Sequence, residues 1–487
     1  YIEKDIKEEN LDVLERFLSF CFLASWSNLG VETAELISKA SEKLLGPEHQ
    51  KTLNIYIHQG NFLNIEAYYE KALNVLNFAL KAQEKTLGIN HSETLTAVNN
   101  LGLLYFNKGD YEKAESLYRR SIEGYEVVLG KDHPSTLTSI GNLGMIFDNI
   151  GDYDQAEELY NDVLFKREKI LGPNHPDTLL TVNNLGFLYF NKGDYEKAEA
   201  FYRRSIEGNE VALGKDHPMT LTSIGNLALL FDEIGDYDQA EELNNDVLFK
   251  REKTLGPNHP DTLLTVNNLG MLYKTKAEYE KAEKFFIRCI EGNQIALGKE
   301  HPNTMLYISN LIECYDESGN YENVIKQYKI LIVLQENKLG PEAFDTLISI
   351  NNLGLAYYND GDYIKAEPLF VKALDGYKKT LDPNDENIRV TTNNLALVYT
   401  ELGNTDKAIE YYKILIELQE NELGADAHDT LLSINSLGLA YYNIGDYPQA
   451  KILFAQAAEG LEETLGKEHV DTVQLLENLA AAQNQIN

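Results

Sequence analysis

The stretch from residue 175 to residue 208 decides the fold, and it reads His-Pro-Asp-Thr-Leu-Leu-Thr-Val-Asn-Asn-Leu-Gly-Phe-Leu-Tyr-Phe-Asn-Lys-Gly-Asp-Tyr-Glu-Lys-Ala-Glu-Ala-Phe-Tyr-Arg-Arg-Ser-Ile-Glu-Gly. Apolar residues recur at three- and four-residue steps in both halves, which predicts two amphipathic helices. Gly193 follows the first helix, where a left-handed residue costs a glycine little, and Asp194 stands where an N-cap belongs. Pro218 opens the next unit, and its missing N–H suits a first helical position. The stretch therefore predicts a helical hairpin.

Copies of this hairpin fill nearly the whole chain, and a leucine closes each copy at intervals of 42 residues. These leucines are Leu45, Leu87, Leu129, Leu171, Leu213, Leu255, Leu297, Leu339, Leu381, Leu423 and Leu465. A fixed period in this range indicates stacked supersecondary units. A second period of 84 overlays the first, because residues 109–186 nearly repeat as 193–270. We therefore expect the surface to alternate in chemistry from one repeat to the next.

Two motifs carry a resemblance to a known repeat family. The copies contain Asn-Leu-Gly-x-x-Tyr, then Gly-Asp-Tyr-x-x-Ala, and small residues such as Gly186 and Ala198 stand where two helices must approach closely. This pattern resembles the tetratricopeptide repeat, whose usual unit has about 34 residues. The period of 42 and the Leu-Gly-x-x-His-Pro-x-Thr connector resemble the kinesin light chain subtype. The resemblance covers roughly residues 50–483. It implies an all-α fold, a right-handed superhelical solenoid of stacked hairpins.

Composition narrows the class of protein and its partners. Lys and Arg total 43 against 77 Asp and Glu, so the formal net charge is −34. This charge disfavours nucleic acid and anionic membrane as partners, because both require a basic surface. No stretch reaches the ~18 apolar residues of a membrane span. Cys21, Cys289 and Cys314 share no repeat position, so reduced thiols in a cytoplasmic protein are the simplest interpretation.

The repeats divide the chain into three parts. Residues 1–46 lack both motifs and predict a divergent helical pair, which is either a capping unit or a face that docks another domain. Residues 47–469 predict ten repeats, the first of them degraded, with His58 in place of the asparagine and Ala67-Tyr68 in place of Gly-Asp. Residues 470–487 predict a final single helix, which is either a cap or a truncated repeat.

Eight histidines share one repeat position, one in each connector. They are His49, His91, His133, His175, His217, His259, His301 and His469. Neighbouring copies lie a repeat apart, too far for shared metal ligation, so we interpret them as helix-entry residues. Gly-Lys-Asp and Gly-Lys-Glu segments end helices, where a phosphate loop would have to begin one. In the absence of nucleophile and metal motifs, the sequence predicts no enzyme activity, no catalytic residue, no cofactor and no metal site.

An asparagine recurs in the middle of the first helix of each repeat, although asparagine is a mediocre helix former. The set is Asn100, Asn142, Asn184, Asn226, Asn268, Asn310, Asn352, Asn394 and Asn478, and Ser436 interrupts it. The resemblance implies that the first helices line a concave groove, where this amide hydrogen-bonds the backbone of an extended partner peptide. The alternative is a structural ladder in which each amide bonds to the neighbouring repeat. A net contribution of ~1 kcal/mol per hydrogen bond suits either hypothesis.

The residues one and two helical turns further on are expected to complete this groove. They include Phe106, Asp148, Phe187, Phe190, Asp232, Tyr358 and Tyr442. Basic residues are scarce on the first helices and sit mainly on second helices, as in Arg119-Arg120, Arg203-Arg204 and Lys250-Arg251, which are expected to face outward. We therefore predict that the groove favours an extended segment with apolar side chains and Lys or Arg.

Three functions follow from this interpretation. The first is a non-catalytic scaffold that binds a partner protein in the groove. The second is the sensor or autoinhibitory arm of a larger signalling protein, linked to an NTPase or a protease, which the start at Tyr1 and the apolar segment 17–26 suggest. The third is a structural subunit of a cytoskeletal or ciliary assembly.

Overall fold

The computed structural model describes residues 10–23, 27–66 and 68–486, and within them every element of regular structure is a helix. The helices are α1 (Leu11–Leu23), α2 (Ser27–Leu45), α3 (Gln50–Ile65), α4 (Tyr69–Thr86), α5 (Ser92–Asn107), α6 (Tyr111–Val128), α7 (Pro134–Asn149), α8 (Tyr153–Leu171), α9 (Pro176–Asn191), α10 (Tyr195–Ala212), α11 (Pro218–Glu233), α12 (Tyr237–Thr254), α13 (Pro260–Thr275), α14 (Tyr279–Ala296), α15 (Pro302–Glu317), α16 (Tyr321–Lys338), α17 (Phe344–Asn359), α18 (Tyr363–Thr380), α19 (Glu386–Glu401), α20 (Thr405–Glu422), α21 (His428–Asn443), α22 (Tyr447–Leu465) and α23 (Val470–Ile486).

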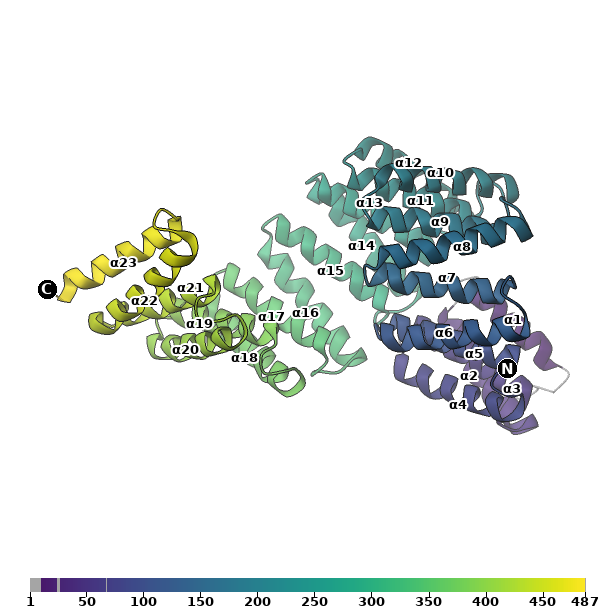
Figure 1. Cartoon of the computed structure of the whole chain (residues 1–487), viewed down its shortest axis with the longest axis horizontal. Coiled ribbons are helices and arrows are strands. Elements are labelled where there is room, and N and C mark those ends of the chain that lie inside the picture. The colour runs from purple at the N-terminus through teal and green to yellow at the C-terminus, as the bar shows by residue number, and fades with distance from the viewer. Residues whose placement is uncertain (1–9, 24–26, 67, 487) are drawn as a thin grey trace. The chain divides into compact units, whose positions relative to one another are not determined.

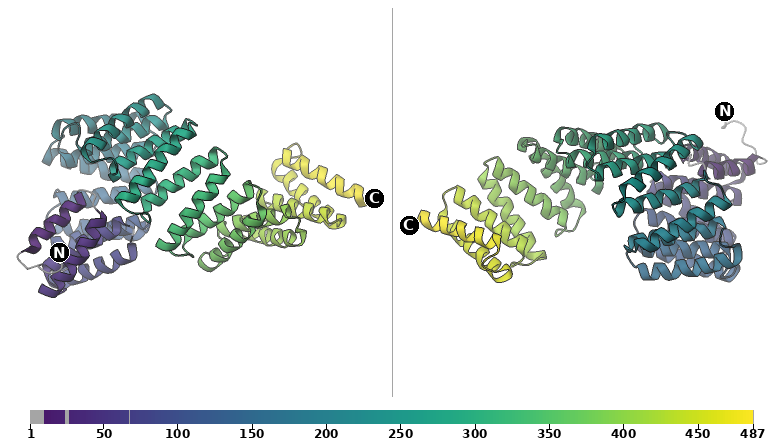
Figure 2. Two further views of the ribbon diagram at one scale, coloured as in Figure 1. Left: turned by 180° about the vertical axis from the view of Figure 1, so that it is seen from behind. Right: turned by 90° about the horizontal axis from the view of Figure 1, so that it is seen from above.

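The chain forms two compact units, Tyr1–Tyr307 and Ile308–Asn487, with the boundary inside α15. In each unit consecutive helices pack against one another as antiparallel pairs (Figures 1 and 2). The expected all-α stack of helical hairpins is therefore confirmed. The sequence did not predict the boundary, because the 42-residue period runs through it without a break.

The hairpins begin at a histidine or its substitute and most of them turn at a glycine, which Ala277 replaces between α13 and α14. In α9 the Nδ1 atom of His175 accepts a hydrogen bond from the N–H of Asp177 at 3.2 Å. All eight connector histidines cap a helix in this way, which confirms their interpretation as helix-entry residues. Gly193 has φ = +75°, and the carboxylate of Asp194 caps α10, as the sequence predicted.

Two small residues allow the hairpin of α9 and α10 to close. A Cβ atom on Gly186 would lie 2.7 Å from the ring of Tyr202, which is 1% exposed. A Cβ atom on Gly208 would lie 2.5 Å from a methyl group of Leu179. Both glycines therefore let a large side chain of the other helix pack directly against backbone. The Asn-Leu-Gly motif thus marks the close approach of the two helices.

Consecutive first helices also contact one another, as α5, α7, α9, α11 and α13 do in turn. No comparable contacts join consecutive second helices such as α6 and α8 in the described residues. First helices are therefore closer together than second helices within each unit. We call the surface that the first helices form the first-helix face.

One prediction about the second helices is wrong. Arg119 and Arg203 are half-exposed, as expected, but Arg251 is only 4% exposed. Its guanidinium donates hydrogen bonds to the carbonyl oxygen of Asp261 at 2.8 Å and to the hydroxyl oxygens of Thr222 and Thr265. Three fixed acceptors from two neighbouring first helices make this burial tolerable, and desolvation lowers the pKa of Arg251.

In the segment before residue 46, α1 and α2 pack against each other and against α3. Leu11, Leu18 and Cys21 join the buried cluster that includes Phe62 of α3. Trp26 lies outside the described residues, so the apolar segment 17–26 is described only in part. The division into a helical pair at residues 1–46, ten repeats at 47–469 and a last helix at 470–487 stays a prediction.

Candidate protein-binding face

The recurring asparagines lie half-buried on the first-helix face. The structure separates them into two groups by their hydrogen bonds. In the first group, the side-chain nitrogen donates to an asparagine oxygen of the preceding repeat, from Asn142 to Asn99 at 3.3 Å and from Asn226 to Asn183 at 3.2 Å. Asn478 and Asn435 form the same pair at 3.0 Å. These pairs are the predicted structural ladder.

In the second group, the amide forms no hydrogen bond within the described residues. Its members are Asn100, Asn184, Asn268 and Asn394. The cause for Asn184 is visible in the sequence, because Gly141 occupies the position at which Asn99 and Asn183 accept in the bonded pairs. In the N-terminal unit the period of 84 therefore decides which amides the fold uses, whereas Asn394 has the ladder position but Thr391 donates to its expected acceptor, Asn351. Two further members have partners in the chain: Asn310, and Asn352, which accepts from Asn351 at 3.3 Å.

Two aspartates that were expected in the groove are largely withdrawn from solvent. Asp148 is 5% exposed, and its carboxylate accepts a hydrogen bond from the amide of Asn191 at 2.9 Å. Asp232 is half-buried, and Thr275 occupies the position that corresponds to Asn191. Desolvation raises the pKa of both carboxyls, and the Asn191 hydrogen bond partly offsets this for Asp148.

Aromatic rings form the end of the first-helix face next to four of the hairpin turns. Phe106, Phe190, Tyr358 and Tyr442 each pack against the tyrosine that begins the following second helix, with ring centroids 5.1 to 6.0 Å apart. Phe187 stacks on Phe190 at 6.3 Å and is 45% exposed. The face thus offers rigid rings, and the exposed ring of Phe187 is accessible to a partner.

The lysines near the face are held by carboxylates of the preceding repeat. Lys108 lies 2.6 Å from a carboxylate oxygen of Glu70, and Lys192 lies 2.7 Å from one of Glu157. Lys276 pairs in the same way with Glu241 at 3.0 Å. Each pair is partly exposed and therefore contributes little stability. However, the pairing neutralises the cations that could attract an acidic partner.

With this geometry established, comparisons with known proteins place the chain in a family. Models described as "Tetratricopeptide repeat" match residues 51–126, 93–164, 166–210, 177–248, 345–421 and 387–463, and a second one with the same description matches 262–303. Together these matches cover more than half of the chain. The chain belongs to the tetratricopeptide repeat family. Repeats of this family mediate contacts between proteins and are generally not catalytic.

Solved structures with similar folds include other tetratricopeptide proteins. One is a signal transduction ATPase with numerous domains and a tetratricopeptide repeat sensor from Pyrococcus horikoshii, at 15% identity and a TM-score of 0.50, covering 93% of this chain and 74% of that one. Another is a protein from Podosopora anserina that is assigned as a kinesin light chain with nearly identical TPR-like repeats, at 23% identity and a TM-score of 0.38, covering 42% and 97%. BtubC (BKLC) from P. vanneervenii gives 22% identity and a TM-score of 0.41, covering 47% and 92%. No protein with a curated description matches the sequence.

The described helices include none that is long and apolar enough to cross a membrane. The same part of the chain contains no group of His, Cys, Asp and Glu placed to hold a metal ion. The three cysteines are buried free thiols. Burial raises the pKa of Cys289, which keeps it protonated and unreactive.

Sequence reasoning missed one contact that joins distant tetratricopeptide repeats. The Nε2 atom of His301, at the start of α15, lies 3.6 Å from a carboxylate oxygen of Glu66, at the end of α3. Both residues are buried, whereas most other connector histidines are partly exposed. The signal was the degraded turn of the first repeat, where Glu66 replaces the lysine found at Lys108 and Lys192. A residue that departs from the repeat can thus mark a contact outside the repeat's own neighbours.

Proposed function

We propose that this tetratricopeptide protein is a non-catalytic scaffold that binds an extended segment of a partner protein along the first-helix face. The observation that carries the proposal is the second asparagine group, above all Asn100, Asn184 and Asn268. These amides recur every 84 residues and have no hydrogen-bond partner in the described chain. A half-buried amide without a partner favours a ligand that supplies one, and an extended peptide backbone offers a donor and an acceptor at each residue.

The charge around the face favours a partner segment with apolar and basic side chains. The net charge is −34, and Lys108, Lys192 and Lys276 are already paired with carboxylates. An acidic segment would therefore meet repulsion without free cations to offset it, whereas Lys or Arg would be attracted. Apolar side chains would pack on exposed rings such as Phe187.

The test compares two matched triple variants against peptides selected from a phage library of random 12-residue sequences. Asn100→Ala with Asn184→Ala and Asn268→Ala removes amides that the fold does not use. We expect unchanged melting and at least tenfold weaker binding of the selected peptides, since each lost hydrogen bond contributes about 1 kcal/mol.

The matched control changes three ladder asparagines to alanine, namely Asn142, Asn226 and Asn478. This variant should melt at a lower temperature and bind more tightly than the first triple variant at a temperature where both are folded. Equal losses of binding in the two variants would contradict the proposed role. Selection of predominantly acidic peptides at low salt would contradict the proposed charge preference.

A second candidate function is the sensor arm of a larger signalling protein. Its support is the likeness in fold to the ATPase with a tetratricopeptide sensor, which extends over 93% of this chain. The complete coding sequence tests it: an NTPase or protease domain encoded in the same reading frame would favour the sensor, and a start codon directly before Tyr1 would remove it.

A further inference from the structure

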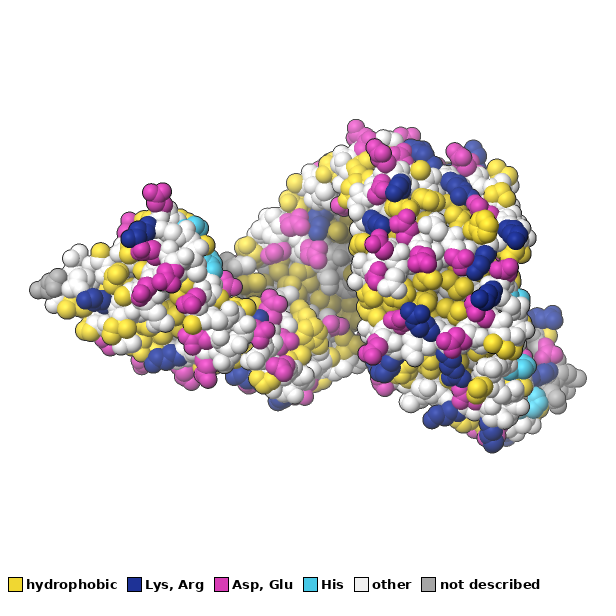
Figure 3. All heavy atoms as spheres, in the orientation of Figure 1, with side chains coloured by type: hydrophobic (Ala, Val, Ile, Leu, Met, Phe, Trp, Pro, Cys, Tyr) yellow, Lys and Arg dark blue, Asp and Glu magenta, His cyan; other side chains and the backbone are white. Residues whose placement is uncertain are grey.

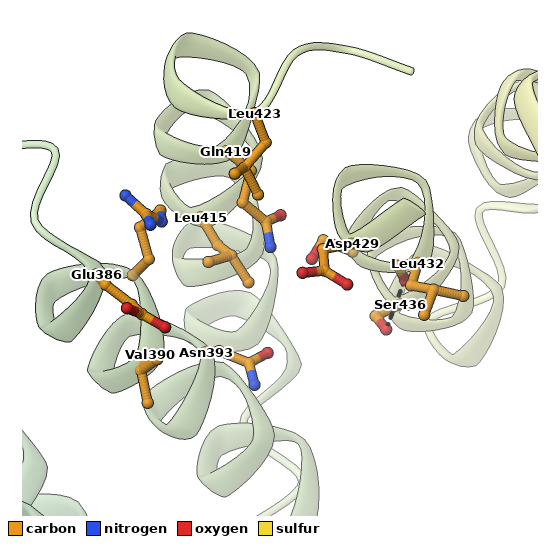
Figure 4. Close-up of a pocket in the computed structure, with 11 residues that line it drawn as sticks. Glu386, Val390, Asn393, Leu415, Gln419, Leu423, Asp429, Leu432 and Ser436 are labelled. Carbon is orange, nitrogen blue, oxygen red and sulfur yellow. Dashed lines mark hydrogen bonds between the residues drawn. The ribbon is translucent and has the colours of Figure 1, made fainter. Parts of the chain in front are cut away.

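A polar cavity of about 430 Å³ lies between α19, α20 and α21, wholly within the C-terminal unit (Figure 4). Glu386, Val390 and Asn393 line it from α19, and Gln419 projects into it from α20 toward Asp429 of α21. Helices α19 and α21 do not approach each other as closely as α17 and α19 or α21 and α23 do. The cavity is therefore a local opening between two first helices, beside the first-helix face.

Departures from the repeat explain why the cavity opens here. We call the region between two consecutive first helices and the second helix that joins them a seam. The equivalent seam five repeats earlier, between α9, α10 and α11, encloses only about 260 Å³. In that seam Leu179 packs against Gly208, whereas the cavity has Arg389 at the position of Leu179 and Leu418 at that of Gly208. The guanidinium of Arg389 donates a hydrogen bond to the carbonyl oxygen of Asn384, in the connector. A core-filling leucine is thus missing from the wall of the cavity.

The polar groups that close the earlier seam are also changed. There, Asn226 donates to Asn183 at 3.2 Å, and the hydroxyl oxygens of Ser205 and Ser223 lie 2.9 Å apart. In the cavity, Ser436 replaces Asn226 and donates instead to a carbonyl oxygen of its own helix. Asn393, the counterpart of Asn183, therefore loses its ladder partner. Leu415 replaces Ser205 in the same way.

The resulting lining is rich in hydrogen-bond acceptors. Gln419 is only 9% exposed, and its Oε1 atom has no hydrogen-bond partner in the described chain. The carboxylates of Glu386 and Asp429 line the cavity from two helices, so together with Arg389 the charged lining sums to −1. Val390, Leu415 and Leu432 supply apolar wall beside these groups. A buried acceptor without a donor is costly, and a ligand with N–H donors would remove that cost.

We propose that this cavity is a specificity pocket that takes the side chain of one arginine or lysine of the bound partner segment. The aliphatic stem packs against Val390 and Leu415, and the cationic head donates to Gln419 and lies between Glu386 and Asp429. The planar fork of an arginine matches several acceptors at once and is preferred over the ammonium of a lysine. The inference rests on the proposed function, since the pocket adjoins the first-helix face at Asn393.

The test uses single-residue probes, so it requires no knowledge of the partner. Ligand-observed NMR would measure binding of N-acetyl-arginine amide, N-acetyl-lysine amide and N-acetyl-citrulline amide, which is close in shape to the first but uncharged. We expect the arginine probe to bind at least fivefold more tightly than the citrulline probe. Asp429→Met, which copies Met219 of the earlier seam, should weaken the arginine probe by a similar factor.

Two controls separate the pocket from general effects of charge. Asp345→Met changes the same position in α17, outside the cavity, and should leave binding unchanged. Met219→Asp, added to Asp429→Met, should not restore the binding, because Leu179, Ser205 and Asn226 still fill the earlier seam. The inference is overturned if citrulline binds as well as arginine, if Asp345→Met weakens binding as much as Asp429→Met, or if N-acetyl-glutamate amide binds most tightly. If only the pocket proposal is wrong, the selected peptides should still bind in a way that depends on Asn100, Asn184 and Asn268. If the scaffold proposal is wrong, the triple alanine variant should bind those peptides as well as the unchanged protein does.

Discussion

The seam between α9 and α11 and the seam between α19 and α21 occupy equivalent positions five repeats apart, but their cavities measure about 260 Å³ and about 430 Å³. We call the first the closed seam, because hydrogen bonds cross it, and the second the open seam. Leucine, serine and asparagine side chains fill the first seam and bond across it. In the second, Arg389, Leu415 and Ser436 take their places, and a cavity remains. The period preserves the helix pairing of both seams, because Ala396 and Ala408 are small residues at the positions of Gly186 and Ala198. A few interior side chains then decide whether a seam stabilises the stack or leaves space for a ligand.

Figure 3 shows the charged side chains on one face of the molecule. Side chains of both signs are interspersed over the visible face of the N-terminal unit. Many of them form exposed ion pairs within and between repeats, such as Arg119 with Glu115. Such pairs contribute little stability, so the interior of each seam is the place to test the comparison.

The largest expected effect comes from opening the closed seam. Leu179→Arg copies Arg389, but Gly208 remains opposite and supplies no side chain to fill the space. Since Leu179 is 1% exposed, we expect the unfolding free energy to fall by about 3 to 5 kcal/mol, as measured by urea unfolding. The reverse change, Arg389→Leu, should alter it by less than about 1 kcal/mol. If the two substitutions lower the unfolding free energy equally, the two seams do not differ in how tightly they are packed.

A smaller effect should follow from rebuilding the ladder in the open seam. Ser436→Asn restores the residue found at Asn226, and its amide should donate to Asn393. One recovered hydrogen bond should raise the unfolding free energy by about 1 kcal/mol. The double variant with Asn393→Ala should lose this gain. If the gain persists in the double variant, the new side chain acts by filling space and not by bonding.

The helix entries of the two seams differ as well. His217 caps α11 through its Nδ1 atom, whereas Ala427 precedes α21 and provides no side-chain cap. Ala427→Ser should therefore stabilise the C-terminal unit by about 0.5 to 1 kcal/mol, measured as a rise in melting temperature. His217→Ala should lower stability by a similar amount. If the melting temperature does not change in either variant, the side-chain caps do not contribute to stability at these two helix starts.

The smallest effect concerns the hydrogen-bonded pair of Asp148 and Asn191, near the C-terminal ends of α7 and α9. Burial raises the pKa of Asp148, so the folded state holds this proton more tightly than the unfolded chain does. Stability therefore falls as pH rises from the unfolded pKa through the folded one. Asp148→Asn copies Asn64, which accepts a hydrogen bond from Asn107 at 3.3 Å. It should add on the order of 0.5 kcal/mol at pH 7 and nothing near pH ~3, where both states are protonated. A gain that does not vary with pH would contradict the role of burial.

Most of the fold and part of the site could be read from the sequence. Leucine spacing, Gly193 and Asp194 predicted the hairpins, because helix periodicity and capping are local properties. The sequence did not decide whether the asparagines form a ladder or bind a peptide in the groove. The hydrogen-bond partner of each amide depends on how neighbouring repeats are placed, which the sequence does not show. The burial of Arg251 was missed because its threonine acceptors lie on two other helices, α11 and α13, and a local pattern does not reveal them.

The sequence by itself determined the repeat, its helix starts and turns, and the close approach of its two helices. Each of these depends on residues near one another in the chain, and each recurs at a fixed interval. The tertiary structure alone decided which asparagines are already bonded, where a seam stays open, and that His301 meets Glu66 across several repeats. Those outcomes depend on side chains from different hairpins meeting in space, where one substitution changes both the volume and the hydrogen bonds that its neighbours can make.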